Sequence, residues 1–142
     1  MRSDYIIVVG CGRLGSILAS RLSGIGHRVV VIDRREAAFD KLTNEFSGFQ
    51  IVGDASEMAV LRAAKIAQAD YLFATTTEDN LNLMVAQIAG SIFNVPHVIA
   101  RVYDPTRESI YRRLNVEMIS PTQLSVAAFL YAVDPSLEHK PL

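Results

Sequence analysis

The stretch Val8-Val9-Gly10-Cys11-Gly12-Arg13-Leu14-Gly15 decides the fold. This Gly-x-Gly-x-x-Gly sequence follows the apolar, β-branched run 5–9, which is typical of a buried parallel strand, and it precedes apolar residues at helical spacing. In such a strand–turn–helix unit, Gly10 permits the tight turn, Gly12 lets the backbone approach a pyrophosphate, and Gly15 lets the helix pack against the strand. The N–H groups at the start of the helix would then face the phosphates of a nucleotide.

A second strand is expected over 28–32, and Asp33 follows it about twenty positions after the glycines. A carboxylate at this place accepts both hydroxyls of a ribose, so strand, helix, second strand and acid together predict a nucleotide site. The alternative is a fold of the same type with an empty pocket. Because an acid repels a 2′-phosphate, NADP is not expected. Arg34 and Arg35 could weaken that repulsion, flank the adenine ring or form a solvated turn.

Length and composition indicate one globular domain without a strong charge. Of the 142 residues 50% are hydrophobic and the net charge is −1, so we expect no binding to nucleic acid or to an anionic membrane surface. Neither a signal peptide nor the ~20-residue apolar run of a transmembrane helix is visible, so direct membrane insertion is not expected. The single cysteine, Cys11, excludes an intrachain disulfide and fits a reducing cytoplasm.

Strand and helix patterns alternate along residues 1–134, and residues 135–142 are expected to be a flexible tail. Short connections favour an α/β, Rossmann-like, doubly wound parallel six-stranded sheet in the order 3-2-1-4-5-6, with its ligand beyond the carboxyl ends of the first and fourth strands. Strands are expected over 5–9, 28–32, 49–52, 71–74, 97–102 and 116–119. Helices are expected after the glycine turn, over 36–46 and 57–64, from Thr77 to Asn94, over 105–113 and after Pro121, with Ser56 and Thr77 as caps.

The last helix is apolar nearly all round between residues 124 and 133. In a domain whose sheet is already covered, one monomer cannot bury both faces of such a helix, which predicts a C-terminal dimerisation helix. The alternative is a terminal helix packed in the core of the monomer.

A series of short motifs runs along the chain: Val8 to Gly15, Val31-Ile32-Asp33, Val52-Gly53-Asp54-Ala55, Ala74-Thr75-Thr76-Thr77-Glu78-Asp79-Asn80, Ile99-Ala100-Arg101-Val102 and Leu114-Asn115-Val116-Glu117-Met118-Ile119-Ser120-Pro121. Together these motifs resemble the N-terminal domain of the regulators of potassium conductance, the RCK or TrkA-N family. The glycine motif is shared with many dehydrogenases, whereas Gly-Asp-Ala followed later by Ile-Ser-Pro and an apolar helix is more specific. The resemblance spans about residues 5 to 133.

The resemblance implies a cytoplasmic sensor domain that lies at the inner face of the membrane through its partner. Such domains bind NAD(H) or an adenine nucleotide (ATP, ADP or AMP) and gate a membrane potassium channel or transporter. They pair through the last helix, and the pairs assemble into rings. Two features depart from the pattern: many members carry a second, C-terminal ligand-binding subdomain, and some ATP-binding members have an acid where this chain has Thr122, so no metal site is expected here.

We assign the whole glycine turn to the nucleotide site: Gly10, Cys11, Gly12, Arg13, Leu14 and Gly15. Arg13 can fork onto phosphate oxygens, or it can be a solvated arginine at a helix start; helix N-termini do not favour cations, which supports the functional interpretation. Cys11 beside a helix N-terminus would have a lowered thiol pKa, but a structural role is favoured over a redox switch.

Further candidates follow the later strands. The resemblance puts Asp54 and Ala55 by the adenine base, with an Asx turn as the alternative or additional role of Asp54. Thr75 and Thr76 are placed to reach a phosphate or the distal ribose, and Asn80 is expected to bond within its own turn. The resemblance also gives Arg101 a terminal phosphate as its partner; an ion pair with Glu78 or Asp104 is the alternative.

The favoured interpretation is a non-enzymatic nucleotide sensor with no catalytic residues. The three histidines lack metal-ligand spacing, and no Ser/His/Asp or Cys/His arrangement can be argued. The alternative is the nucleotide-binding domain of an NAD-dependent oxidoreductase, although the Rossmann-type fold uses the whole sequence and leaves no substrate-holding region. A third possibility is an assembly module with a degenerate pocket, which would not require Asp33.

Overall fold

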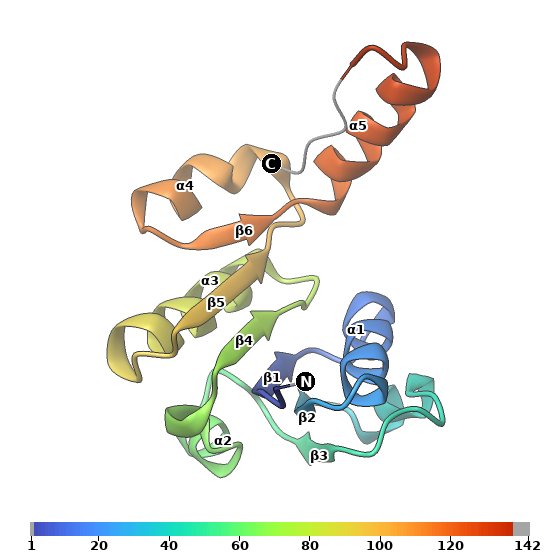
Figure 1. Cartoon of the computed structure of the whole chain (residues 1–142). Coiled ribbons are helices and arrows are strands. Elements are labelled where there is room, and N and C mark those ends of the chain that lie inside the picture. Colours follow the sequence, from blue (N-terminus) through green and yellow to red (C-terminus); the bar gives the residue numbers. More distant parts are fainter. Residues whose placement is uncertain (1, 138–142) are drawn as a thin grey trace.

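The computed structural model describes residues 2–137, and Figure 1 shows them as one sheet flanked by helices. The sheet has six strands in the order β3-β2-β1-β4-β5-β6, and every neighbouring pair is parallel, as the sequence predicted. The strands are β1 (Tyr5–Val9), β2 (Arg28–Asp33), β3 (Phe49–Val52), β4 (Tyr71–Ala74), β5 (His97–Arg101) and β6 (Glu117–Ile119). The α-helices are α1 (Arg13–Gly24), α2 (Met58–Ala63), α3 (Asp79–Gln87), α4 (Glu108–Arg113) and α5 (Pro121–Val133).

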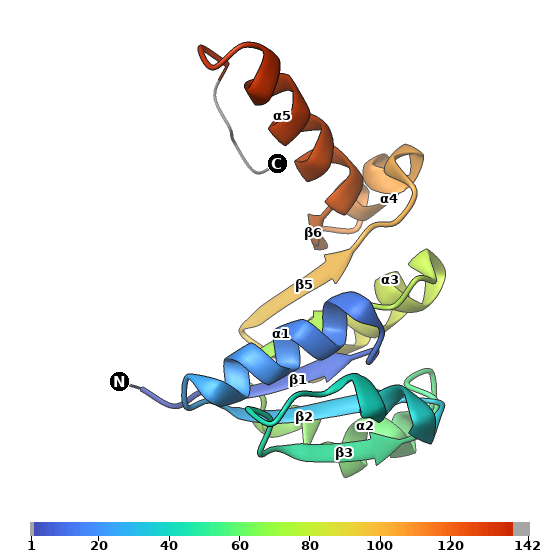
Figure 2. The same ribbon diagram turned by 90° about the vertical axis from the view of Figure 1, so that its right-hand side faces the viewer.

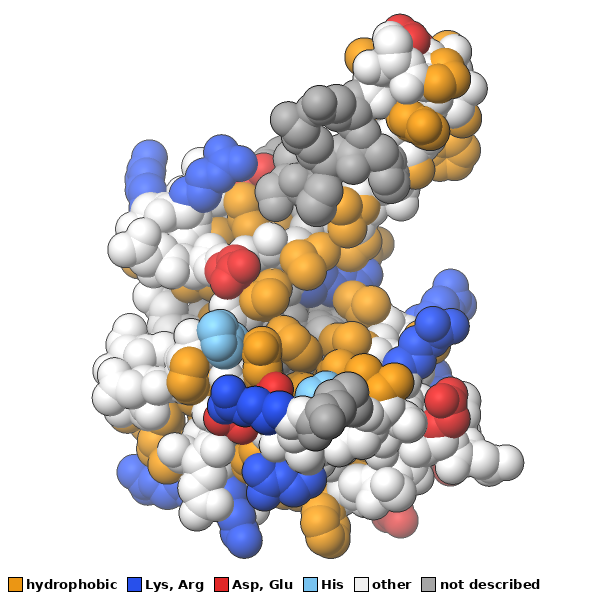
Figure 3. Space-filling model, viewed as in Figure 1, with side chains coloured by type: hydrophobic (Ala, Val, Ile, Leu, Met, Phe, Trp, Pro, Cys, Tyr) orange, Lys and Arg blue, Asp and Glu red, His pale blue; other side chains and the backbone are white. Residues whose placement is uncertain are grey.

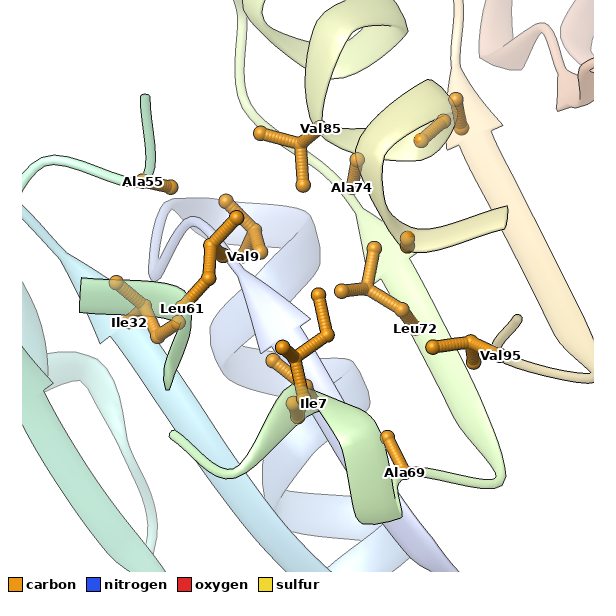
Figure 4. Packing of buried hydrophobic residues seen from close by; sticks show 14 of the residues in the cluster. Ile7, Val9, Ile32, Ala55, Leu61, Ala69, Leu72, Ala74, Val85 and Val95 are labelled. Carbon is orange, nitrogen blue, oxygen red and sulfur yellow. The ribbon is translucent and has the colours of Figure 1, made fainter. Parts of the chain in front are cut away.

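Two hydrophobic cores lie on opposite faces of the sheet, because successive side chains of a strand point to opposite faces. One core takes Ile7, Val9, Val30 and Ile32 of the central strands, together with Leu61 of α2 and Val85 of α3. Figure 4 shows the packing of this cluster around Ile7, Val9 and Leu61. The other takes Ile6, Val8, Val29 and Val31 with Cys11 and Ala19. The sequences of β1 and β2 are almost entirely apolar because both faces of these strands are buried.

The expected α-helix over 36–46 is wrong: only a 3-10 helix, Glu36–Lys41, forms there. Side-chain hydroxyls capture the backbone N–H groups that a longer helix would need. The Ser20 hydroxyl accepts from the N–H of Thr43 at 3.1 Å, and the Ser23 hydroxyl accepts from the N–H of Ser47 at 2.9 Å. These bonds tie the segment after Lys41 to α1. Serine and threonine side chains commonly compete in this way with the hydrogen bonds of a helix.

Several helix boundaries also differ from the expected ones. Ser56 and Thr77 do not cap helices; Glu57 and Glu78 precede α2 and α3, and neither makes a side-chain capping bond. The helix after Thr77 continues from α3 into a π-helical turn, Ile88–Ile92, and stops before Asn94, whose φ of 53° is left-handed. Asparagine tolerates that conformation, which explains the stop signal in the sequence. The element over 105–113 divides into a 3-10 turn, Pro105–Arg107, and α4.

Helix α5 projects from the body of the domain, as Figure 2 shows. None of its residues is buried, and Figure 3 shows hydrophobic side chains on its surface. Phe129 is 76% exposed and Val133 is 86% exposed. The alternative of a terminal helix packed in the monomer core is therefore wrong. The N-terminus of α5 is capped, because the Ser120 hydroxyl accepts from the N–H of Gln123 and Pro121 occupies the first turn.

The end of the chain is described only to residue 137. Asp134 accepts from the N–H and the hydroxyl of Ser136, so residues 134–137 form a hydrogen-bonded turn. The rest of the expected tail, 138–142, lies outside the described residues. None of the described helices has both the length and the apolar character that crossing a bilayer requires.

Candidate functional site

A cleft of about 1030 Å³ opens at the carboxyl ends of the central strands, where the strand order reverses. This is the place at which doubly wound sheets bind ligands. All the predicted site residues lie in its wall except Cys11, Gly15 and Asp54. Those in the wall are Gly10, Gly12, Arg13, Leu14, Asp33, Arg34, Ala55, Thr75, Thr76 and Arg101.

The glycine turn has a different requirement at each of its three glycines. Gly10 has a φ of 101°, which favours glycine, and its N–H donates to the carbonyl oxygen of Ile32 at 2.7 Å. A methyl group at Gly15 would overlap the carbonyl oxygen of Gly10, so α1 packs directly on the turn. At Gly12 a methyl group would meet nothing within 4 Å, which leaves open space over the start of α1. Backbone conformation therefore explains Gly10 and packing explains Gly15, but neither explains Gly12.

Asp33 joins the glycine turn to the loop after β2. Its Oδ2 accepts from the N–H of Cys11 at 2.8 Å, and its Oδ1 accepts from the N–H of Arg35 at 2.9 Å. Each carboxylate oxygen still has a lone pair to offer, so the group can accept further hydrogen bonds on the side that faces the cleft. The acid is thus fixed in place by two backbone donors and is able to receive two hydroxyls.

The expected lowering of the Cys11 thiol pKa is wrong. Burial, and secondarily the nearby Asp33 carboxylate, raises the pKa of Cys11 to about 11. The side chain is fully buried against the sheet, and α1 begins only at Arg13. The cleft receives the backbone of the turn around Cys11 rather than its sulfur, which fits the structural role.

Thr75 and Thr76 both reach the cleft, with hydroxyl groups already bonded within the protein. The Thr75 hydroxyl lies 3.0 Å from the carbonyl oxygen of Val9 and 3.1 Å from that of Gly10, so it braces the glycine turn from β4. The Thr76 hydroxyl donates to Asn82 Oδ1 at 2.7 Å. Toward a ligand, each side chain has only an acceptor lone pair left.

Arg101 ends β5 in the cleft wall with few of its donors engaged. Its Nη1 lies 3.5 Å from the carbonyl oxygen of Thr75, and its guanidinium carbon lies 5.5 Å from the centre of the Tyr103 ring. Its Nε is buried without a partner in the described part of the chain. No ion pair of Arg101 with Glu78 or Asp104 occurs among residues 2–137. A buried, unsatisfied guanidinium donor next to a cleft is suited to an anionic group.

Asp54 lies at a second hollow of about 550 Å³ that also has Arg34 in its wall. Its Oδ1 accepts from the N–H of Ser56 at 2.9 Å, which is the Asx turn considered from the sequence, and the Ser56 bonds lower the pKa of Asp54. Ala55 is buried in the neighbouring wall of the main cleft. Across residues 2–137, no three His, Cys, Asp or Glu side chains gather to hold a metal ion.

The model of the TrkA-N domain matches residues 6–121. This chain belongs to the TrkA-N domain family. Among curated relatives of the TrkA-N domain described here, the Trk system potassium uptake protein TrkA of Streptomyces coelicolor is 36% identical over 132 residues, which cover 93% of this chain and 59% of the relative. The chain thus spans little more than half the length of that relative.

Solved structures share the fold of this TrkA-N domain. The TrkA-N domain of the inner membrane protein ybaL from Escherichia coli has a TM-score of 0.82 at 19% identity and covers 94% of this chain and 98% of its own. The Kef CTD of Shewanella denitrificans in an AMP-bound form has a TM-score of 0.75 at 20% identity, covering 94% and 84%. The GsuK channel bound to NAD has a TM-score of 0.72 at 19% identity, covering 91% and 23%.

Sequence reasoning missed two buried polar residues of this TrkA-N domain, Asp79 and Asn82. Asn80, expected to bond within its own turn, instead lies in the first turn of α3 and accepts from Arg107. A signal for Asn82 was available: it is an amide between Leu81 and Leu83 in an apolar helical pattern. A polar side chain in such a run demands a buried partner.

Proposed function

We propose that this chain is a cytoplasmic regulatory domain that binds an adenine nucleotide, NAD(H) or one of ATP, ADP and AMP. The observation that carries the proposal is the joint geometry of Gly12 and Asp33. Gly12 leaves open space over the start of α1, and Asp33 presents a fixed carboxylate beside it. A pyrophosphate over the helix N-terminus and a ribose on the acid would fill both. Relatives of the same fold that are bound to AMP or NAD support this assignment.

In this proposal the thirteen predicted residues divide into phosphate, ribose and adenine contacts. The backbone from Gly10 to Gly15 and the guanidinium groups of Arg13 and Arg101 hold the phosphates. Asp33 holds the ribose. Ala55 and the Asp54 turn lie by the adenine, together with Arg34. Thr75 and Thr76 complete the wall beneath the phosphates. No residue is assigned a catalytic role, and no metal is required.

The proposed output is control of a membrane potassium channel or transporter. Relatives named as potassium uptake proteins support it. The exposed apolar side chains of α5 support pairing of two copies through this helix, with larger rings as a further step. Nucleotide exchange would shift Arg13, Thr75 and Arg101 relative to one another and pass to the partner copy. A nucleotide can shift such an assembly only as far as it prefers one arrangement over the other.

The test combines native mass spectrometry of the purified protein with thermal shift in the presence of NAD⁺, NADH, ATP, ADP and AMP. The proposal expects a dimer or larger assembly and a rise in Tm with at least one of these ligands. A monomer that no adenine nucleotide stabilises would refute it. An exclusive response to NAD(H), accompanied by NADH consumption with a candidate substrate, would favour the oxidoreductase alternative instead.

A further inference from the structure

The first turn of α3 buries two polar side chains on the side that faces β4 and β5. Asp79 and Asn82 lie one helical turn apart, so they share a face of the helix. Asn82 is fully buried, with 0% exposure, and it is not part of the cleft wall. A buried amide is costly unless its donors and acceptors are satisfied, so its partners identify its role.

Asn82 uses its whole hydrogen-bonding capacity to join the carboxyl ends of two neighbouring strands. Its Oδ1 accepts from the N–H of Thr76 at 3.0 Å and from the Thr76 hydroxyl at 2.7 Å. Its Nδ2 donates to the carbonyl oxygen of Thr76 at 2.9 Å and to that of Arg101 at 3.0 Å. A backbone N–H can only donate and a carbonyl can only accept, so the orientation of the amide is fixed.

The main chain after Arg101 is held from α3 and α4 as well. Asp79 accepts from the N–H groups of Tyr103 at 2.6 Å and Asp104 at 2.9 Å. The Tyr111 hydroxyl donates to the carbonyl oxygen of Asp79 at 2.8 Å and lies 3.3 Å from that of Arg101. The backbone of Arg101 is therefore rigidly placed, whereas the Nε of its guanidinium has no partner in the described protein.

We infer that Asn82 is the positioning residue of the nucleotide cleft, which holds Thr76 and Arg101 in register so that the Arg101 guanidinium meets the phosphates. This inference rests on the proposed function. It assigns Asn82 no contact with the nucleotide. Its effect reaches only those ligand groups that the Arg101 guanidinium touches, so loss of the amide weakens a phosphorylated ligand more than the bare nucleoside.

The test compares the Kd of ADP, whose pyrophosphate is common to NAD, with that of adenosine. Asn82→Asp keeps the shape and the acceptor but turns a carboxylate oxygen toward two carbonyl groups. The Kd of ADP is expected to rise about tenfold, the loss of one charge-assisted hydrogen bond, while that of adenosine changes less than about twofold. In an Arg101→Ala background, Asn82→Asp should leave the ratio of the two Kd values unchanged.

Val85→Ala is the matched control, because Val85 is buried on the same helix but packs only in the hydrophobic core. It should lower the Tm without changing the ratio of the ADP and adenosine Kd values. If circular dichroism shows that Asn82→Asp is unfolded, Asn82→Ala is measured against the same criterion.

Equal weakening of ADP and adenosine by the Asn82 variant, or a change of ratio that persists without Arg101, would overturn the inference. If the unsubstituted protein binds ADP and the variant binds it equally well, the positioning role alone fails. If the unsubstituted protein binds no adenine nucleotide, the proposed function fails and the inference with it.

Discussion

Replacement of Gly12 by alanine should separate nucleotide binding from folding. The backbone of Gly12 has a φ of −80° and a ψ of −159°, which alanine adopts without strain, and the added methyl group would meet nothing within 4 Å. Alanine is a poorer N-cap than glycine but also restricts the unfolded chain, and these effects oppose each other. We expect the free energy of unfolding to change by less than about 1 kcal/mol, and the Tm by less than about 4 °C.

Binding should respond much more strongly than folding. Gly12 lies in the cleft wall at the start of α1, so its methyl group would occupy the space that a pyrophosphate needs to reach the N–H groups there. Loss of two charge-assisted hydrogen bonds at about 1.5 kcal/mol each amounts to about 3 kcal/mol, or roughly 150-fold in the Kd of ADP.

Gly15→Ala provides the contrasting control within the same turn. Its methyl group would overlap the Gly10 carbonyl oxygen and lie 2.7 Å from the Thr75 hydroxyl oxygen. The backbone must move to relieve this overlap, at about 3 kcal/mol and roughly 10 °C in Tm. Isothermal titration calorimetry with ADP and thermal denaturation measure both variants. Wild-type affinity for ADP in Gly12→Ala, or equal loss of stability in the two variants, would contradict a pyrophosphate site at the start of α1.

Four further predictions concern the ribose contact, the phosphate contact, the Cys11 thiol and the exposed face of α5. Asp33→Ala should raise the Kd of AMP, ADP and NAD⁺ by a similar factor of roughly 30, about 2 kcal/mol of lost ribose bonds, and a loss confined to one ligand in calorimetric titrations would contradict the ribose assignment. Arg13→Ala should weaken ATP about tenfold more than AMP, and an unchanged ratio of the two Kd values would remove its phosphate role. Because burial raises the pKa of Cys11 to about 11, iodoacetamide at pH 8 should label the unfolded but not the folded protein in mass spectra, and rapid labelling of the folded form would contradict that pKa. Phe129→Asp should convert the assembly to monomers in light scattering while the far-UV circular dichroism stays unchanged, because Phe129 is 76% exposed in the single chain, and an unchanged assembly would exclude pairing through this face of α5.

Local patterns were enough to predict the strand order and the place of the cleft. The apolar runs of β1 and β2 differ from the amphipathic helices in period, and the glycine turn with Asp33 fixes the direction of the first βαβ unit. Burial on both faces then follows from parallel pairing, and the exposed apolar surface of α5 follows from composition alone.

The missed features depend on contacts between residues distant in sequence. The helix was expected to continue to Phe46, but the hydroxyl groups of Ser20 and Ser23, more than twenty positions away, accept from the N–H groups of Thr43 and Ser47. The pKa of Cys11 depends on its burial beneath the sheet rather than on its position beside a helix. Asn82 of α3 and Tyr111 of α4 both bind the carbonyl oxygen of Arg101 in β5, a contact between elements that lie apart in the sequence.

An adenine nucleotide is expected to occupy the cleft at the carboxyl ends of β1, β2 and β4. Titration of the ¹⁵N-labelled protein with ADP, followed by amide chemical shifts, tests it most directly. If the nucleotide binds there, the largest shifts are expected at Gly10 to Gly15 and around Asp33, with little change at Phe49 and Lys65, which line the hollow at the amino ends of the strands. The absence of shifts, or shifts centred on Phe49 and Lys65, would contradict it.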